Sequence, residues 1–209
     1  MTNKSLNETQ IRKVMEKVVL DITMSLDGFI AGPHDEVKTP LHQWLFNGDV
    51  PSKYNSFFKL SKESAKVFDE LVKTTGSIIT GRRTYDLTGG WGGSHPVSNS
   101  VFVLSHDIPK DVPEGSTAFT FVSDGIESAV KQAKKAAGKK NVYLMGGANV
   151  VQQCIKAGLV DEMMIHLVPV LLGDGIRLFD NLGGQQIELK QTEVIEAPDV
   201  THLRFRVVK

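Results

Sequence analysis

The chain has 209 residues, of which 41% are hydrophobic and 23% charged, a balance that is typical of a globular domain and excludes a mainly disordered chain. Its 24 Lys and Arg equal its 24 Asp and Glu, so no global charge attracts it to nucleic acid or to an anionic membrane. The single cysteine, Cys154, excludes an internal disulfide framework, and no apolar run reaches the ~20 residues of a membrane helix. Because residues 1–16 also lack the apolar stretch of a signal peptide, we expect a cytoplasmic protein.

The chain begins with a polar stretch and then changes to apolar, strand-like sequence. Residues 1–16 are expected to be an N-terminal extension of a single domain at 17–209. The run at 17–25 is rich in β-branched and apolar residues and predicts a strand, and an Asp-Gly pair predicts the turn after it. Apolar residues at helical spacing, Phe57 among them, predict a helix over residues 53–74.

Strands and helices alternate through the middle of the chain. Short apolar runs predict strands at 77–80, 101–104 and 118–122. A helix is expected after them at 125–137, with an apolar stripe along one side and Asp124 as its N-cap.

The last third of the chain changes from alternation to an antiparallel finish. A strand at 141–145 leads into a helix at 148–157, and a long apolar strand follows at 162–172. Two further strands, 186–195 and 201–208, predict a hairpin. The order of elements predicts an α/β fold with a mixed sheet flanked by helices and a C-terminal antiparallel hairpin.

Three of the predicted strands end in residues that suit a phosphate group. The first ends in Gly81, Arg82, Arg83 and Thr84, at the start of a predicted helix. A helix N-terminus offers free N–H groups and a positive dipole end, and the planar guanidinium group binds phosphate oxygens in pairs. A plain helix start with solvated arginines explains this segment equally well.

The second strand end carries a hydroxyl and an imidazole. Leu104 is the last strand residue, and Ser105 and His106 come next. Both polar side chains can hydrogen-bond an anion. For a lone Ser-His pair, a polar strand end without function is the simpler interpretation.

The third strand end carries a double glycine. Its residues are Met145, Gly146, Gly147, Ala148 and Asn149. Two residues without Cβ let a ligand approach the backbone, and a helix N-terminus again follows. The pattern is not the G-x-G-x-x-G fingerprint of a Rossmann site, and tight strand–helix packing is the alternative explanation.

The three strand ends together make a stronger case than any one of them. Ligands collect at the carboxyl ends of strands in an open α/β sheet, so three such ends predict one phosphate-binding site. Positive or potentially positive groups at two of the ends favour the phosphorylated ribose of NADP over NAD.

Five motifs resemble the dihydrofolate-reductase-like superfamily, and most closely its riboflavin-biosynthesis reductase branch, the RibD C-terminal domain family. They are SLDGFIAG (25–32), TGRRTYD (80–86), VLSHD (103–107), VYLMGGANVVQQ (142–153) and PVLLGDGIRLF (169–179). The resemblance covers residues 17 to 208. It implies a mixed sheet flanked by helices, NADPH as the hydride donor, a small-molecule substrate and a homodimer.

Carried over by position, the resemblance also implies where NADPH binds. Arg82, Arg83 and Thr84 would hold the 2′-phosphate and its neighbour, beside Ser105 and His106. The segment 146–149 would line the pyrophosphate and nicotinamide side, and Ala31 would lie near the nicotinamide ring.

The chain departs from folate reductases at the acid that binds the pteridine. Ser64 and Ala65 occupy that part of the helix, and Glu63 is adjacent. Glu63 and Asp27 are our candidate catalytic residues, for substrate contact or proton transfer. A helix turns about 100° per residue, so Glu63 need not face the same pocket, and turn chemistry is the simpler interpretation of Asp27.

We therefore expect an NADPH-dependent reductase of a pyrimidine- or pterin-like heterocycle, with 5-amino-6-(5-phosphoribosylamino)uracil as the substrate that the resemblance suggests. Two alternatives remain open: a non-catalytic NADP-binding module, and a dihydrofolate reductase in which another acid replaces the missing one. A zinc deaminase needs an H-x-E followed by P-C-x-x-C, and with a single cysteine this sequence cannot supply that combination, so we expect no metal site and a stand-alone reductase.

Overall fold

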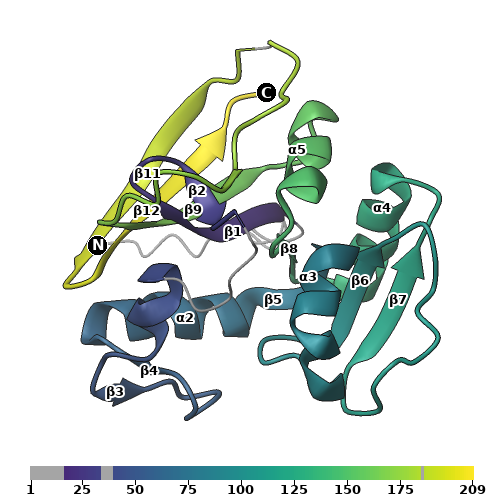
Figure 1. Ribbon diagram of the computed structural model, residues 1–209, viewed down its shortest axis with the longest axis horizontal. Helices are drawn as coiled ribbons and strands as arrows, with labels where there is room; N and C mark the ends of the chain where they lie inside the picture. Colours follow the sequence, from purple (N-terminus) through teal and green to yellow (C-terminus); the bar gives the residue numbers. More distant parts are fainter. Residues whose placement is uncertain (1–16, 34–39, 185) are drawn as a thin grey trace, which may run out of the picture.

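The computed structural model describes residues 17–33, 40–184 and 186–209. These residues form one large mixed β-sheet and the helices that cover it (Figure 1). The strands of this sheet are β1 (Val18–Ser25), β5 (Thr75–Gly81), β6 (Ser100–Leu104), β7 (Ala118–Val122), β8 (Asn141–Leu144), β9 (Glu162–Val168), β11 (Leu189–Ala197) and β12 (Val200–Val207). They lie in the order β11-β12-β9-β1-β8-β5-β6-β7. All neighbouring pairs are parallel except β9–β12 and β11–β12. The expected mixed sheet with a C-terminal antiparallel hairpin is confirmed, whereas the expected N-terminal extension lies outside the described residues.

Helices cover both faces of the sheet. They are η1 (Pro40–Leu45), α2 (Lys62–Thr74), α3 (Arg82–Leu87), η2 (Gly89–Gly93), α4 (Ile126–Ala137) and α5 (Ala148–Lys156). Leu41 of η1 and Phe68 of α2 belong to the core on one face, and Ala129 of α4 and Val151 of α5 to the core on the other. Figure 1 shows α2 and α5 on opposite sides of β1. Two ribbons complete the fold: β2 (Phe29–Ala31) pairs with β10 (Ile176–Arg177), and β3 (Val50–Pro51) with β4 (Lys59–Leu60).

The alternation of side chains along β1 assigns its residues to the two cores. Leu20 and Ile22 pack into the core beneath α4 and α5, and full burial of a side chain such as Leu20 stabilises the fold by about 1.5–3 kcal/mol. Val19 belongs to the core beneath α2. Since successive strand residues point to opposite faces, Asp21 and Thr23 lie on the same face as Val19. The α2 face of β1 therefore carries polar side chains at its carboxyl end.

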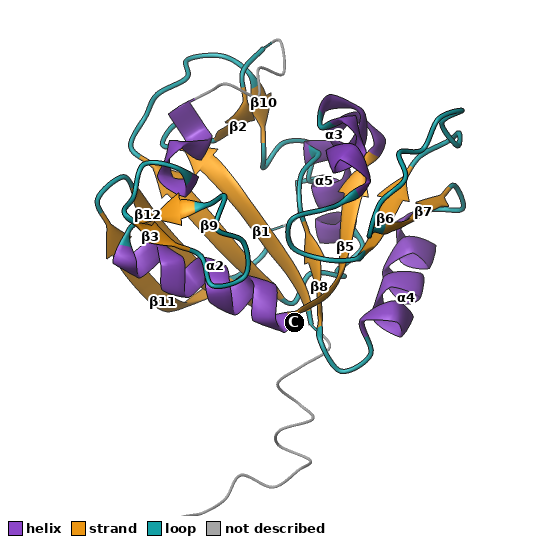
Figure 2. Cartoon of the chain, turned by 90° about the horizontal axis from the view of Figure 1, so that it is seen from below, coloured by secondary structure: helices purple, strands orange, loops and turns teal. Residues whose placement is uncertain are grey.

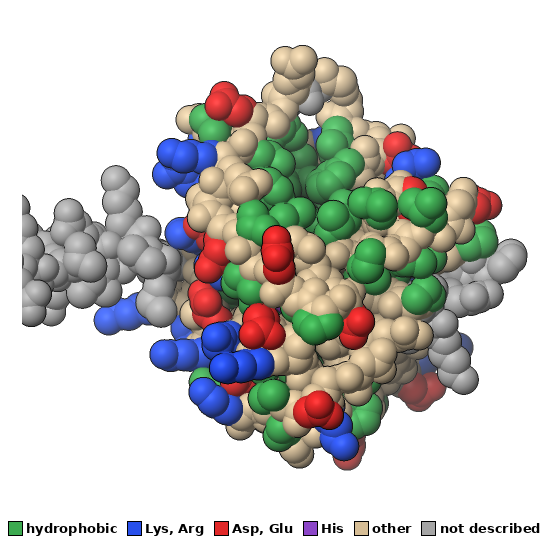
Figure 3. Space-filling model, turned by 90° about the vertical axis from the view of Figure 1, so that its left-hand side faces the viewer, with side chains coloured by type: hydrophobic (Ala, Val, Ile, Leu, Met, Phe, Trp, Pro, Cys, Tyr) green, Lys and Arg blue, Asp and Glu red, His purple; other side chains and the backbone are tan. Residues whose placement is uncertain are grey.

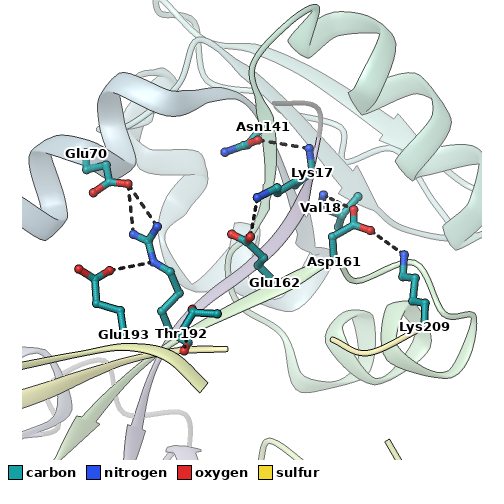
Figure 4. A network of polar contacts seen from close by, with 10 residues as sticks. Lys17, Val18, Glu70, Asn141, Asp161, Glu162, Thr192, Glu193 and Lys209 are labelled. Carbon is teal, nitrogen blue, oxygen red and sulfur yellow. Dashed lines mark hydrogen bonds and ion pairs between the residues drawn. The ribbon is translucent and has the colours of Figure 1, made fainter. Parts of the chain in front are cut away.

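Polar contacts tie the amino-terminal end of the sheet together (Figure 4). The backbone N–H of Lys17 donates to the side chain of Asn141 at 3.2 Å, and the Lys17 ammonium pairs with Glu162. Arg204 pairs with Glu70 at 3.2 Å, which links the hairpin to α2. These contacts lie towards the amino-terminal ends of β1, β8 and β9 and leave the carboxyl ends of these strands free of them.

The predicted helix over 53–74 was wrong in its first turns. α2 begins only at Lys62, because the Ser61 hydroxyl caps it by accepting from the backbone N–H of Ser64 at 3.1 Å. Before that point the chain forms β4, and Phe57 is 71% exposed. Aromatic residues that happened to continue the helical spacing belong to the β3–β4 ribbon and its loop.

Several other boundaries differ from the prediction, among them the strand predicted at 186–195, which is β11 at Leu189–Ala197. Gly125, with φ of 105°, is the N-cap of α4, whereas the Asp124 carboxylate accepts from the Ser128 hydroxyl at 2.8 Å. The strand predicted at 162–172 ends at Val168, because Pro169 has no N–H for the sheet ladder. Within the described residues, none of the helices has the length and apolar character needed to cross a membrane.

Candidate active site

The site forms because β8 is shorter than the strands on either side of it. β8 ends at Leu144, which pairs with Leu20 of β1 and Ile79 of β5. Beyond this row β1 continues to Ser25 and β5 to Gly81, and none of the described strands lies between them. Figure 2 shows β1 and β5 diverging towards this end of the sheet. Their carboxyl ends therefore flank an opening.

A cavity of about 950 Å³ occupies this opening. Its glycine half is lined by the residues that follow β5, β6 and β8, namely 81–84, 104–107 and 145–149. Its aromatic half is lined by residues from β1, η1, α2, β9 and the segment before α2, chiefly Asp21, Thr23, His42, Trp44, Phe46, Phe58, Phe68 and His166. Ala31 lines the cavity as well. The structure thus brings all the expected cofactor-binding residues to one cavity, because β8, β5 and β6 are parallel neighbours.

Gly146 and Gly147 form a turn that requires residues without Cβ. Their φ angles are 85° and 80°, a region that side chains rarely adopt. A Cβ on Gly146 would lie 2.9 Å from Cγ2 of Thr84, and one on Gly147 would lie 3.5 Å from Cα of Gly81. α5 follows this turn without a side-chain hydrogen bond at its N-cap. Backbone donors at the start of α5 are therefore left for a ligand, a cradle that suits phosphate.

Arginine side chains stand beside this cradle. Nε of Arg82 donates to both carboxylate oxygens of Asp86, at 2.8 and 2.9 Å, and Nη1 donates to the carbonyl of Asp107 at 3.1 Å. Arg83 is exposed and also lines the cavity. The Ser105 hydroxyl donates to the Asp107 carbonyl at 2.6 Å and so closes a turn. The glycine half is accordingly basic, and Arg82 already has a fixed orientation.

The aromatic half is built around Trp44. Its ring centroid lies 4.7 Å from that of His166 and 5.2 Å from that of His202, and its Nε1 donates to the Thr23 hydroxyl at 3.2 Å. No Lys or Arg side chain lines this half within the described part of the chain. A flat, largely apolar ligand fits such walls better than a multiply charged one.

The rim of the aromatic half is also apolar. Phe46 lines the cavity, is 44% exposed and packs edge-on against Phe57 with 5.5 Å between ring centroids. Figure 3 views the molecule from the left-hand side of Figure 1, and hydrophobic side chains gather in the upper half of that face. An apolar substituent on a ligand ring is therefore compatible with the entrance.

A chain of hydrogen bonds leads from the aromatic half into the core. Oδ1 of Asp21 lies 3.2 Å from Nε2 of His166, and Nδ1 of His166 lies 2.7 Å from Nδ1 of His202. Nε2 of His202 lies 2.9 Å from Oγ of Ser64. The exposed fraction is 9% for the Asp21 side chain and 1% for His202. The chain crosses β1, β9 and β12 and ends in the first turn of α2.

Each hydrogen bond between Ser64 and Asp21 can be assigned a donor and an acceptor. Burial, together with the nearby His166, lowers the pKa of His202 to about 3, so the ring is neutral near neutral pH and carries one N–H. The Ser61 hydroxyl donates to Ser64, whose own hydrogen is then available for Nε2 of His202. His202 donates from Nδ1 to His166, and His166 donates from Nε2 to the Asp21 carboxylate. With this assignment every hydrogen bond points towards Asp21.

His42 brings an unpaired polar atom to the same half of the cavity. Its Nδ1 is buried and has no hydrogen-bond partner among the described residues. Burial, with a contribution from His166, lowers the pKa of His42, which favours the neutral ring. Leaving a buried polar atom unpaired costs about 1–3 kcal/mol, which a polar ligand atom at this point would offset.

The two predicted catalytic acids lie elsewhere: neither Asp27 nor Glu63 lines the cavity. The Asp27 carboxylate accepts from the Ser25 hydroxyl at 2.6 Å and from the backbone N–H groups of Leu172 and Gly173 at 3.2 and 2.8 Å. These bonds, with that of Ser25 the strongest, lower the pKa of Asp27 to about 2. Glu63 lies in the first turn of α2.

Three residues of the aromatic half, Asp21, His166 and His202, carry no motif in the sequence that marks them as site residues. Each is a lone polar residue in a strand, and only the pairing of β9 with β1 and β12 brings them together. The sequence gives little signal for Asp21, because it alternates with the apolar neighbours Leu20 and Ile22, a pattern that predicts a strand with one polar face.

Comparisons with known proteins agree with this architecture. The sequence model of the RibD C-terminal domain matches residues 16–203. YwjB of Bacillus subtilis, an uncharacterized protein, is 30% identical over 183 residues, covering 85% of this chain and 91% of YwjB. RibD of Acinetobacter baumannii has a TM-score of 0.64 at 18% identity, over 97% of this chain and 62% of RibD. Dihydrofolate reductase of Enterococcus faecalis, solved with NADP(H), has a TM-score of 0.58 at 14% identity, over 92% of this chain and 97% of that one. The expected dihydrofolate-reductase-like fold is confirmed.

Proposed function

We propose that this chain, which belongs to the RibD C-terminal domain family, uses NADPH to reduce a pyrimidine- or pterin-like heterocycle. It is a reductase, and the reductases that share its fold imply a nicotinamide cofactor. One observation carries the finer proposal: a single cavity joins a basic, glycine-lined half to an aromatic half with one buried carboxylate. The first suits a dinucleotide and the second suits a planar ring.

The glycine half fits the cofactor. The turn at Gly146 and Gly147 and the uncapped start of α5 would hold the pyrophosphate, because no Cβ stands between the backbone and the ligand. Arg82 and Arg83 would hold the 2′-phosphate through paired guanidinium hydrogen bonds. When bound, the cofactor supplies the hydride.

The aromatic half would position the acceptor. Trp44 and Phe58 exclude water from the reacting ring, and Asp21 and His42 present polar atoms to its edge. Such positioning contributes up to about 7–11 kcal/mol to lowering a barrier between two reactants. We further propose that Asp27, the candidate suggested by the sequence, acts through the loop at Leu172 and Gly173 and does not contact the substrate.

The substrate is the finer part of this proposal. A Thermotoga maritima relative is named as a deaminase and 5-amino-6-(5-phosphoribosylamino)uracil reductase, which makes that compound the first candidate. Among the described residues, the aromatic half has no Lys or Arg to bind the phosphate of this compound. Its dephosphorylated form and dihydrofolate are therefore tested beside it as candidate substrates. The homodimer and the cytoplasmic location stay predictions.

The test is the consumption of NADPH, followed by nicotinamide absorbance, with each of the three compounds. Oxidation that requires one of them, and that Gly146→Val abolishes while the exposed Glu196→Gln retains it, supports the proposal. NADPH binding without oxidation by any compound favours the non-catalytic module. Failure to bind NADPH contradicts the proposal entirely.

A further inference from the structure

We propose that Gln152 positions the nicotinamide end of the cofactor by fixing the β2–β10 ribbon to α5. Its side-chain amide joins the helix whose start would hold the pyrophosphate to a ribbon that lines the same cavity. Gln152 itself does not line the cavity, so it is a positioning residue and not a catalytic one. This inference rests on the proposed function, because it requires a dinucleotide that reaches from the start of α5 to the ribbon.

Gln152 is a polar residue on the buried side of α5. Only 7% of it is exposed, and Val151 and Cys154 are buried beside it. The next residue, Gln153, instead donates from its amide to the side chain of Asn149 at 2.6 Å, along the exposed side of the helix. Burying an amide is unfavourable unless its polar atoms have hydrogen-bond partners. The partners of Gln152 therefore indicate its role.

These partners are two consecutive backbone carbonyls at the end of β10. Nε2 of Gln152 donates to the carbonyl of Arg177 at 3.2 Å and to that of Leu178 at 3.1 Å. Successive carbonyls of a regular strand point in opposite directions and cannot share one nitrogen. Here they can, because the pairing of β10 with β2 is irregular at Arg177 and the strand ends there. The two N–H groups of the amide supply one donor for each carbonyl.

The ribbon that Gln152 fixes forms a wall of the cavity. Figure 2 shows β2 and β10 side by side, and Ala31 of β2 pairs with Ile176 of β10. Both residues line the cavity. Gly175 fits tightly against β2, since a Cβ on it would overlap the carbonyl oxygen of Ala31. Because the two strands fit together so closely, a shift of β10 moves the cavity wall with it.

Other contacts stiffen the ribbon without joining it to the cofactor site. The Arg177 guanidinium lies 4.4 Å from the centroid of the Phe29 ring, and its Nη1 donates to the carbonyl of Asp27 at 3.1 Å. These partners belong to β2 and to the turn before it. Among the described residues, the side-chain hydrogen bonds between α5 and the end of β10 are those of Gln152.

The contact sets the spacing between the two ends of a bound dinucleotide. Ala148, at the start of α5, lines the part of the cavity that suits the pyrophosphate, and Gln152 is about one helical turn further along. Loss of both donors would leave the buried carbonyl of Leu178 unpaired and let the ribbon move away from α5. If the wall is in place in only a fraction of the molecules, the apparent affinity falls by that fraction. The loss concerns the nicotinamide end and not the phosphates at α3.

The test compares the binding of NADPH with that of 2′,5′-ADP, which has the 2′-phosphate and the adenosine but no nicotinamide. Gln152→Met keeps the length of the side chain and removes both N–H donors. In calorimetric titrations we expect this variant to bind NADPH more weakly by about fivefold or more, and 2′,5′-ADP within about twofold of the wild type. Gln132→Met, at an exposed glutamine of α4, should bind both ligands as the wild type does.

Hydrogen exchange followed by NMR tests the same contact in the wild-type protein. The side-chain N–H protons of Gln152 should exchange more slowly than those of the exposed Gln132, and NADPH should slow them further while 2′,5′-ADP does not. The backbone N–H of Leu178, which donates to the carbonyl of Gly28 at 3.1 Å, should exchange faster in Gln152→Met than in the wild type. Equally fast exchange of the two glutamine side chains would overturn the inference, even where Gln152→Met fails to fold.

Failure of this inference is distinguishable from failure of the proposed function. If NADPH does not bind the wild type, the proposed function fails. If it binds, but Gln152→Met weakens both ligands equally, weakens 2′,5′-ADP more or changes neither, the positioning role of Gln152 is wrong and the cofactor site stands. A general loss of stability lowers both affinities alike, so a purely structural role of Gln152 does not produce the expected difference between the ligands.

Discussion

Acidification should destabilise this protein through histidines that are buried without charge. Burial lowers the pKa of His95 to about 4 and, together with His166, that of His202 to about 3. In the unfolded chain both rings return to about 6.5. Since the folded-state pKa lies below the unfolded one, the unfolded chain binds more protons in the window between them. The stabilisation is therefore present above about pH 6.5 and is lost as the pH falls towards the folded-state values.

The magnitude follows from the titration of the unfolded chain. Between about pH 7 and pH 5 a histidine that stays neutral in the fold costs about 2 kcal/mol of unfolding free energy. His95 and His202, which are 8% and 1% exposed, together cost about 4 kcal/mol. His42, whose pKa is also lowered, acts in the same direction. A typical domain has about 5–15 kcal/mol in total, so the effect is large.

Urea unfolding at several pH values measures this loss directly. His95→Gln keeps an acceptor for the backbone N–H of Val97, which His95 Nδ1 now binds at 3.2 Å, and removes the titrating ring. The variant should lose about 2 kcal/mol less than the wild type over the same interval. An unfolding free energy that is flat between about pH 7 and pH 5, or an identical loss in the variant, would refute the assignment of buried neutral rings.

Other substitutions test separate parts of the account. Leu20→Ala, at a side chain with no exposure, should cost about 2–5 kcal/mol in urea unfolding, and a cost below that range would mean that β1 is not central to the core. Gly146→Ala should cost about 1–3 kcal/mol because of its positive φ and the contact of a Cβ with Thr84, and should weaken NADPH binding. Gly32→Ala is the matched control, since a Cβ there meets nothing within 4 Å; equal effects of the two would contradict the tight turn. Asp27→Asn should lower the melting temperature, because the carboxylate holds the backbone of Leu172 and Gly173. The pKa of Asp27 is depressed to about 2, so its contribution is present above its usual pKa and lost as pH falls through about 2; a variant that melts like the wild type near neutral pH would contradict this role.

The order of strands and helices was predictable because it depends on local patterns. Each of these patterns determines the structure of the short segment in which it occurs. Examples are the alternation along β1, the apolar stripe of α4 and the double glycine at Gly146 and Gly147. The start of α2 was not predictable from spacing alone. Phe57 continues the helical spacing of the apolar residues, but it is exposed and lies in the loop between β3 and β4.

The aromatic half illustrates what sequence patterns leave out. Asp21 and His166 are far apart in the chain and meet because β9 pairs with β1 in one register. His202 joins them from the hairpin, opposite His166. A lone polar residue in a strand does not indicate its partner, so the hydrogen-bonded chain emerges only from the strand order. The glycine half was accessible because each of its segments carries its own signal.

The most direct test of the central claim is a fluorescence titration of the protein with NADPH and with NADH, in the wild type and in the Arg82→Ala/Arg83→Ala double variant. Arg206→Ala, an exposed arginine on β12, is the control for loss of charge. We predict that the wild type and Arg206→Ala bind NADPH more tightly than NADH by about tenfold or more, and that the double variant binds both alike. Equal binding of the two nucleotides by the wild type, or a preference that survives the loss of both arginines, would contradict a phosphate site at the start of α3.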